Sequence, residues 1–385
     1  MQTFIPGPPM GTATRLPNPP AEAGMSLLEV DTPALLVDLD ALERNLARMA
    51  DLARAAGVAL RPHAKTHKSP ELARMQIAAG AVGVCCQKVS EAQAMVAGGV
   101  RNVLVSNEIV DLRKLDRLAR LAKAARVSVC SDDISNVDAL SAAACAHGVS
   151  LRVLVEIDVG ARRCGVASVE TAVALARRIA SSPGLSFGGL QAYHGPAQHQ
   201  REYEGRRQAV EEAVGRSRNV RDRLLAEGLG CATITGGGTG TCDFEASSGV
   251  YTEIQPGSYV FMDADYRRNR NADGREFDTF EQSLFVLATV MSNALDNTVV
   301  VDAGMKALSV DSGMPLVVGI PSARYVRASD EHGTLELPGS LRLGDRVRLV
   351  PGHCDPTVNL HDWYVGVRAD RVETVWPVAA RGPGF

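Results

Sequence analysis

The chain has 385 residues, of which 45% are apolar and 22% are charged, as in ordinary soluble globular proteins. Its 41 Lys and Arg residues are balanced by 44 Asp and Glu residues, giving a net charge of -3. The composition therefore shows no basic excess for binding nucleic acid or an acidic membrane surface, and we find no apolar stretch long enough to span a bilayer. This length predicts one large domain and a smaller one.

The N-terminal residues 1–31 are rich in proline and lack the charged start and apolar block of a signal peptide. They predict an extended, mobile leader. The chain has eight cysteines but no Cys-x-x-Cys pair, and most of them lie within apolar runs, as small buried residues do. We therefore expect a reducing, cytoplasmic location.

Between about residues 40 and 260, short apolar runs alternate with amphipathic stretches, which is typical of a parallel sheet with helical crossovers. A count of roughly eight runs favours a closed (β/α)8 TIM-type barrel; one misread run would leave an open doubly wound sheet as the alternative. The predicted strands are Val58–Leu60, Val82–Cys86, Asn102–Ser106, Val127–Cys130, Leu151–Ile157, Phe187–Ala192, Ala232–Thr235 and Glu253–Val260. The predicted helices include Asp40–Ala55, Ser90–Ala97, Leu112–Ala125, Asn136–His147, Val169–Ala180 and Gln208–Glu227.

After about Phe280 the pattern changes to strands with few helices between them, which indicates an all-β domain. We assign residues 32–275 to the barrel and residues 276–385 to this C-terminal domain. Its predicted strands are Ser283–Val290, Thr298–Val301, Arg324–Ala328, Arg346–Val350, Trp363–Val367 and Val372–Val378.

Polar residues of unusual kinds follow the predicted barrel strands, at the ends where such barrels carry their chemistry. These residues and segments are Lys65, Gln87, Asn107, Asp132, Asp158–Gly165, Tyr193–His199 and Thr235–Thr241. Several clusters at one face of a barrel are harder to explain by chance than any one of them.

Lys65 lies in the basic segment Arg61–Lys68, directly after a predicted strand. Neighbouring positive charge disfavours an ammonium group, so we expect a lowered pKa for Lys65 and an amine able to act as a nucleophile. The alternative is a solvated basic loop.

The glycine run 236–240 would let backbone amides approach an anion such as phosphate; the alternative is a flexible loop. The run lacks the Gly-Lys-Ser/Thr of a nucleotide P-loop and the spacing of the dinucleotide fingerprint. A phosphate site on a barrel together with a reactive lysine suggests pyridoxal 5'-phosphate (PLP).

His353 and Asp355 follow the predicted strand at Arg346–Val350 and are two residues apart. On an extended segment both side chains would face the same way, and one imidazole plus one carboxylate suits a divalent metal with open positions. The alternative is an Asp-Pro turn beside a surface histidine.

Taken together, these segments resemble the D-threonine aldolase and D-3-hydroxyaspartate aldolase family. That family belongs with the D-serine dehydratases to the alanine-racemase fold of PLP enzymes. The segments that carry the resemblance are Arg61–Lys68, Val84–Ala92, Glu156–Gly160, Arg163–Gly165, Gln191–Gly195, Thr235–Gly240, Gln255–Tyr259 and His353–Thr357. The resemblance extends from about Thr32 to Arg381.

The resemblance implies a homodimer with the site at the subunit interface, and residues before the barrel that help to build the β-domain. It implies that Lys65 binds PLP covalently, that His199 is the base near the substrate hydroxyl, and that His353 and Asp355 bind the metal. Arg163 would face the phenolic oxygen of PLP and Tyr193 would flank its ring. The phosphate would be held by Gly238, Thr239, Gly257 and Ser258.

Gln255 would lie near the pyridine nitrogen of PLP. The racemases have arginine at this position, so the resemblance implies a weaker electron sink in this chain.

By the same resemblance, the chain cleaves D-β-hydroxy-α-amino acids to glycine and an aldehyde. One alternative is a dehydratase that releases ammonia and a 2-oxo acid. The resemblance implies that the dehydratases of the family have His-x-Cys as their metal pair and bind zinc there. Here the pair is His353 and Asp355, and a carboxylate favours magnesium or manganese and so the aldolase. A second alternative is a non-catalytic PLP-binding protein.

The substrate side chain remains open between threonine, 3-hydroxyaspartate and others. Arg267, Arg268 or Arg270 could pair with a second substrate carboxylate, which would suit 3-hydroxyaspartate. The alternative is a solvated basic loop.

Overall fold

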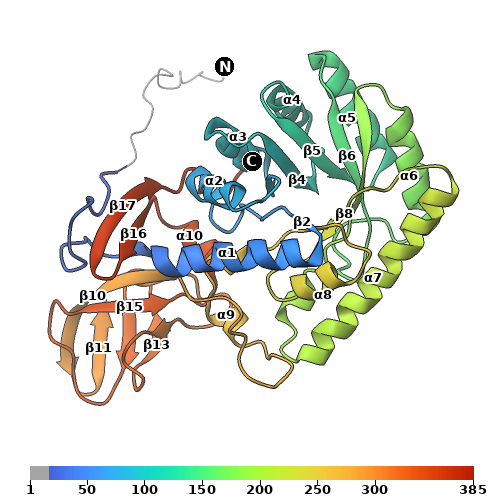
Figure 1. Ribbon diagram of the computed structural model, residues 1–385. Helices are drawn as coiled ribbons and strands as arrows, with labels where there is room; N and C mark the ends of the chain where they lie inside the picture. Colours follow the sequence, from blue (N-terminus) through green and yellow to red (C-terminus); the bar gives the residue numbers. More distant parts are fainter. Residues whose placement is uncertain (1–16) are drawn as a thin grey trace, which may run out of the picture.

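The computed structural model describes residues 17–385 and arranges them around two sheets (Figure 1). Of the extended leader predicted for residues 1–31, residues 1–16 lie outside the described residues. Within residues 17–385, no helix combines the length and the apolar character that crossing a membrane requires.

The first sheet is an eight-stranded parallel sheet in the order β2-β9-β8-β7-β6-β5-β4-β3. Its two end strands are joined by a bridge between His63 and Cys85 and by a hydrogen bond from the Ala64 amide to the Cys85 carbonyl at 2.8 Å. The sheet therefore curls into a closed barrel, which confirms the predicted fold class against the open sheet. Its strands are β2 (Ala59–Leu60), β3 (Val84–Cys86), β4 (Asn102–Glu108), β5 (Arg126–Ser131), β6 (Leu151–Glu156), β7 (Leu185–Gln191), β8 (Ile234–Gly236) and β9 (Glu253–Ile254).

Helices connect successive barrel strands, and the longer ones lie on the outside of the barrel (Figure 1). The connecting helices are α2 (Pro70–Ala78), α3 (Val89–Ala97), α4 (Leu112–Leu121), α5 (Ile134–His147), α6 (Val169–Ser181), η1 (Pro196–His199), α7 (Tyr203–Ala226) and α8 (Cys242–Ser247). Two further short helices, η2 (Ser258–Val260) and α9 (Ala264–Arg267), follow β9 and lead to the second sheet. Helices α3 to α7 follow amphipathic stretches expected from the sequence, because apolar residues at helical spacing turn one face to the sheet.

Helix α1 (Leu39–Ala56) runs between the two sheets in Figure 1. It begins where the Asp38 carboxylate accepts a hydrogen bond from the Ala41 amide at 3.0 Å, and it ends at Gly57, whose φ of +68° favours glycine. Its buried face, with Leu42 and Met49, belongs to the same apolar core as residues of the second sheet. This shared core fixes the second sheet against the barrel.

The second sheet has nine strands, mostly antiparallel, with β13-β14-β11-β10-β1-β16-β17 as its main order; off this path, β15 pairs with β10 and β12 pairs with β15. Its strands are β1 (Ala34–Asp38), β10 (Leu284–Leu295), β11 (Thr298–Val301), β12 (Leu316–Val317), β13 (Arg324–Ala328), β14 (Gly333–Glu336), β15 (Arg346–Val350), β16 (Trp363–Arg368) and β17 (Arg371–Pro377). Strand β1 lies in the range that the sequence analysis gave to the barrel, yet it pairs with β10 and β16. The exact domain limits stay a prediction.

The segment before β1 packs on the second sheet, and the end of the chain joins that sheet to the barrel. The segment at residues 17–31 runs along β17, where the Gly24 amide donates to the Val372 carbonyl at 2.8 Å. The C-terminal residues return to the barrel, where the Phe385 amide donates to Ser90 Oγ of α3 at 3.0 Å.

The strand predicted at Glu253–Val260 is wrong beyond Ile254, because β9 has only two residues and the short helix η2 follows. Pro256 has no amide hydrogen to donate to a ladder, so the chain leaves the sheet there. This turn carries Gln255, Gly257 and Ser258 across the C-terminal end of the barrel.

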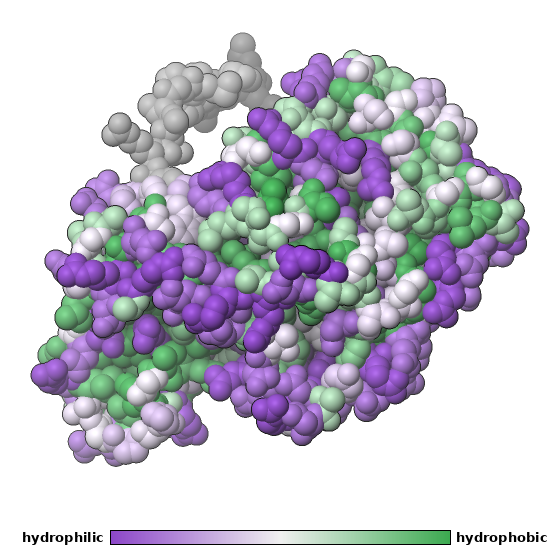
Figure 2. Space-filling model, viewed as in Figure 1, coloured by the Kyte–Doolittle hydropathy of each residue, from purple (hydrophilic) through white to green (hydrophobic). Residues whose placement is uncertain are grey.

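On the face shown in Figure 2, hydrophilic and hydrophobic residues are interspersed, with a hydrophobic area over the second sheet. Several large apolar side chains of the second-sheet region are exposed. They are Met291, Leu295, Met305, Met314, Leu316 and Leu343.

Candidate active site

Lys65 and Asp355 meet where the C-terminal end of the barrel faces the second sheet. Lys65 lies in the turn after β2, and Asp355 lies in the first turn of α10 (Cys354–Val358), which follows β15. Lys65 Nζ donates a hydrogen bond to Asp355 Oδ2 at 2.8 Å. Lys65, predicted to bind the cofactor, and Asp355, predicted to bind the metal, are thus direct neighbours, although they are 290 positions apart in the sequence.

The predicted lowering of the Lys65 pKa is wrong in this structure. Asp355 raises the pKa of Lys65, and this attraction outweighs the effect of burial. The surrounding imidazoles do not act as cations, because burial lowers the pKa of His63 to about 3 and that of His67 to about 4. Burial alone would raise the pKa of Asp355, but Lys65 and His353 outweigh it and hold that pKa well below its usual range.

The prediction that His353 and Asp355 lie on an extended segment is only half right. His353 has an extended backbone, but it is the N-cap of α10, so Asp355 is already helical. The two groups still act on each other: burial lowers the pKa of His353, and Asp355 and Asp311 outweigh it and raise that pKa. Between them, Cys354 is fully buried, and its amide donates to Asp263 Oδ2 at 2.9 Å.

A metal ion at this place would have few protein ligands. No group of three or more His, Cys, Asp or Glu side chains within residues 17–385 is arranged to hold one. The Nδ1 atom of His353 lies 2.9 Å from Asp311 Oδ2, which leaves Nε2 for a metal. An imidazole with one carboxylate fits a cation that takes its other ligands from water and substrate, as Mg²⁺ often does.

His199, the predicted base, lies on η1 after β7 with its side chain 51% exposed. Its Nδ1 lies 2.7 Å from Asp265 Oδ2, and its ring centroid lies 5.9 Å from that of Tyr266. Burial, followed by the charges of Tyr193, Asp263 and Asp355, raises the pKa of Tyr266.

Arg163 and Tyr193 also lie together. The Arg163 guanidinium is 5.8 Å from the centre of the Tyr193 ring and 3.8 Å from Glu156 Oε1. Burial raises the pKa of Tyr193, while the charges of Lys65 and Arg163 partly offset this effect. Burial and Glu108 raise the pKa of Glu156 to about 9, which keeps this carboxyl protonated at neutral pH.

The glycine-rich loop after β8 and the turn after β9 pack closely against neighbouring side chains. A Cβ atom at Gly238 would lie 2.5 Å from Gln198 Oε1, and one at Gly257 would lie 2.5 Å from Thr66 Oγ1. Thr66 is buried, and its hydroxyl has no hydrogen-bond partner among the described residues. A bound phosphate would suit this place. The Thr66 hydroxyl next to Lys65 could donate to it, and Gly238 and Gly257 have no room for a side chain of their own.

The remaining predicted phosphate residues, Thr239 and Ser258, are buried on the same two segments; Thr239 Oγ1 accepts a hydrogen bond from the Tyr259 amide at 3.0 Å. Gln255 points into a buried amide cluster, where its Nε2 donates to Gln191 Oε1 and Thr235 Oγ1, both at 2.8 Å. A neutral amide at this position agrees with the weaker electron sink that the sequence implies.

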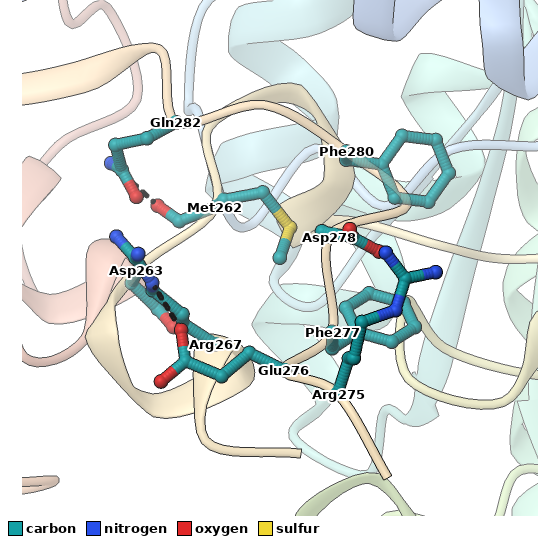
Figure 3. Close-up of a pocket in the computed structure, with 9 residues that line it drawn as sticks. All are labelled: Met262, Asp263, Arg267, Arg275, Glu276, Phe277, Asp278, Phe280 and Gln282. Atoms are coloured by element: carbon teal, nitrogen blue, oxygen red, sulfur yellow. Dashed lines mark hydrogen bonds and ion pairs between the residues drawn. The ribbon is translucent and has the colours of Figure 1, made fainter. Parts of the chain in front are cut away.

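The three arginines considered for a second substrate carboxylate are at different places. Arg267 pairs with Glu276 at 2.8 Å in a pocket of about 330 Å³ (Figure 3), and none of the nine lining residues is one that we assign to the cofactor, the base or the metal. Arg268 donates to Asp265 Oδ1 at 2.5 Å. Arg270 is exposed, and its amide donates to the Arg201 carbonyl at 2.8 Å.

No role was predicted for Asp263, Asp265, Asp311 or Glu156, although each contacts a predicted site residue or its neighbour. For Asp263 and Asp265, the Asp-Ala-Asp spacing beside a basic run was the available signal. The partners of Asp263 and Asp265 are 91 and 66 positions away, so spacing alone could not identify them.

The barrel has a lysine after its first strand, and the second sheet brings a carboxylate to that lysine. This arrangement defines a protein of the alanine-racemase fold. The family model "Alanine racemase, N-terminal domain" matches residues 37–265, and "Putative serine dehydratase domain" matches residues 283–367. The chain belongs to the family of the 3-hydroxy-D-aspartate and D-threonine aldolases, as the sequence predicted.

It is 52% identical to the 3-hydroxy-D-aspartate aldolase of Paracoccus denitrificans (strain Pd 1222), covering 95% of this chain and 96% of that protein. It is 48% identical to the D-threonine aldolase of an Arthrobacter species, covering 94% and 96%. The crystal structure of D-threonine aldolase from Filomicrobium marinum matches with a TM-score of 0.92 at 50% identity, covering 95% of this chain and 100% of that one. Similarity to the D-threo-3-hydroxyaspartate dehydratase of Delftia sp. (strain HT23) is lower, at 30% identity over 91% of this chain and 98% of that protein.

Proposed function

We propose that the chain is a PLP-dependent carbon–carbon lyase that cleaves D-β-hydroxy-α-amino acids into glycine and an aldehyde, assisted by a divalent metal. The 2.8 Å contact between Lys65 Nζ and Asp355 Oδ2 carries the proposal, because it joins the amine that would bind PLP to the carboxylate that would bind the metal. The aldolase relatives at 48–52% identity support this reaction over dehydration, because the dehydratase of Delftia sp. is only 30% identical.

The residues present fit PLP. Lys65 would hold its aldehyde, Arg163 its phenolic oxygen and Tyr193 its ring. The phosphate would take hydrogen bonds from the backbone amides of Gly238, Thr239, Gly257 and Ser258, with the unpartnered Thr66 hydroxyl close by. Gln255 would lie at the pyridine nitrogen.

When bound, PLP supplies a sink for the electrons of the breaking Cα–Cβ bond, and a divalent cation supplies positive charge that lowers the pKa of the substrate hydroxyl. His199 accepts the proton of that hydroxyl through Nε2, since Nδ1 is occupied by Asp265. Asp355 and His353 orient the hydroxyl side of the substrate toward His199. Arg163 balances negative charge at the phenolic end of the site.

The metal pair favours the aldolase over the dehydratase on chemical grounds. A carboxylate at Asp355 suits Mg²⁺ or Mn²⁺. By the same resemblance, the dehydratases of the family have a His-x-Cys pair at this place, which suits zinc. Cys354, the nearest thiol, is fully buried, and burial raises its pKa well above the usual range, which disfavours a thiolate ligand. A non-catalytic PLP-binding role would leave the second sheet and its pairing with Lys65 without a use.

The proposal includes a cytoplasmic homodimer with the site at the subunit interface. The exposed large apolar side chains of the second-sheet region support it, because exposed apolar side chains that gather on one face mark interaction surfaces. The eight cysteines, all unpaired in this structure, support a reducing compartment.

The test is product analysis with purified protein, PLP and Mn²⁺. D-Threonine and D-3-hydroxyaspartate are supplied in parallel with their L-enantiomers as controls. Glycine plus acetaldehyde or glyoxylate from the D-substrates supports the proposal. Ammonia plus a 2-oxo acid would replace it with the dehydratase.

A further inference from the structure

We propose that Asp265 is a positioning residue that fixes the orientation and the tautomer of His199; this inference rests on the proposed function, in which His199 is the base. Asp265 lies in α9, and only 5% of its side chain is exposed. Its Oδ2 lies 2.7 Å from His199 Nδ1, while its Oδ1 accepts from Arg201 at 2.6 Å and from Arg268 at 2.5 Å.

His199 needs such a support because of where it lies. It is the last residue of a short 3-10 helix, and half of its side chain is exposed, so little packing restricts its rotamer. The contact with Asp265 leaves the ring one orientation and places its proton on Nδ1. The unprotonated Nε2 is then free to accept a proton from the substrate hydroxyl.

Asp265 is itself held rigidly and in its charged form. Burial would raise its pKa, but the contacts with His199, Arg201 and Arg268 outweigh it and hold that pKa far below the usual range. Its amide donates to the Gly352 carbonyl at 3.2 Å, which ties the backbone of α9 to the turn before the metal pair.

The same short helix also contacts the segment that carries His353. The Cys354 amide donates to Asp263 Oδ2 at 2.9 Å, and the Ala264 amide donates to the Pro351 carbonyl at 3.0 Å. Arg268, which contacts Asp265, also donates to the Ser312 carbonyl in the second sheet's region. The base and the proposed metal ligands are thereby held in one frame, although they come from different parts of the chain.

The first test is Asp265→Asn. In this variant the amide oxygen would face the two guanidinium groups, and the NH2 group would face His199 Nδ1. Nδ1 would then have to accept a hydrogen bond, which moves the ring proton to Nε2 and blocks it as a base. We expect kcat for the D-substrate to fall at least tenfold, with KM within threefold and the visible band of bound PLP unchanged. The matched control is Glu276→Gln, which neutralises an exposed carboxylate paired with Arg267 and should leave kcat within twofold.

The second test separates action through His199 from a structural role. In a His199→Ala background, adding Asp265→Asn should change kcat by less than twofold, because the group that Asp265 positions is already gone. A full tenfold loss in that background, or an unchanged kcat in the single variant, would overturn the inference.

A third measurement needs no activity and no variant at position 265. Nitrogen-15 histidine spectra of the wild-type protein, with the His199 signals assigned by their loss in His199→Gln, should show the neutral ring protonated on Nδ1. A ring protonated on Nε2 overturns the inference even if Asp265→Asn does not fold. Absence of aldolase products from the wild-type protein, in contrast, would refute the proposed function and leave the Nδ1 result standing.

Discussion

Glu245 should make the folded protein less stable as the pH rises. It is 1% exposed in α8, beside the glycine-rich loop; its Oε1 accepts from Thr241 Oγ1 at 3.0 Å, and its Oε2 has no hydrogen-bond partner among the described residues. Burial raises the pKa of Glu245 from 4.5 to about 8. The folded state therefore holds this proton more tightly than the unfolded state does.

The sign and size of the effect follow from that shift. The stabilisation is fully present below pH 4.5 and is lost as the pH rises through about 8. One pH unit corresponds to about 1.4 kcal/mol, so the free energy of unfolding should fall by roughly 3 to 5 kcal/mol between pH 5 and 9 through this group alone. Glu245→Gln keeps the shape but cannot ionise, so the variant should lack this part of the decline.

The assay is urea unfolding of the PLP-loaded protein at several pH values between 5 and 9. The difference in unfolding free energy between Glu245→Gln and wild type should grow in favour of the variant as the pH rises. Glu212→Gln, which changes an exposed residue of α7, serves as the control and should parallel wild type. If Glu245→Gln also parallels wild type over the whole range, the argument from burial is refuted.

Three further predictions concern other parts of the site. Arg206→Met should lower the free energy of unfolding, measured in urea, by roughly 3 kcal/mol or more. Arg206 is 1% exposed and donates to four backbone carbonyls, those of Gly240, Gln200, Arg201 and Arg270. The control Arg218→Met changes an exposed arginine and should alter the free energy of unfolding little. Asp355→Ala should keep PLP bound but make turnover insensitive to added Mn²⁺; full metal stimulation would remove Asp355 from the ligand set. Gly257→Ala should weaken PLP binding at least fivefold in a spectral titration, since the new Cβ would lie 2.5 Å from Thr66 Oγ1, and unchanged affinity would contradict the proposed cradle.

Much of the fold could be predicted because its pattern is local. The barrel helices follow apolar residues at helical spacing, and the C-terminal strands at residues 298–301, 324–328 and 346–350 lie where alternation and turn residues indicate them. Strand β1 was missed because its partners, β10 and β16, follow far later in the chain. The overlong strand at Glu253–Val260 came from reading apolar residues past Pro256, where the ladder cannot continue.

The sequence predicted residues that the fold brings close together, such as Lys65 and Asp355, but it did not predict their charges, and their roles stay predictions. The sequence predicted a lowered Lys65 pKa from the positive charge of its neighbours in the basic segment Arg61–Lys68, which includes His63 and His67. Burial keeps both imidazoles neutral, and the group that decides the charge of Lys65 is Asp355 from the second sheet. Asp265 was overlooked for the same reason, because its contact with His199 depends on the tertiary fold.

The covalent attachment of PLP to Lys65 is the claim on which the account depends, and borohydride reduction followed by peptide mass spectrometry tests it directly. The lysine most able to compete is Lys68, three residues on, whose Nζ donates to Glu91 Oε1 at 2.6 Å in a buried pair. We predict that the reduced pyridoxyl group is found on Lys65. Its recovery on Lys68 or any other lysine, or on none, would contradict the account.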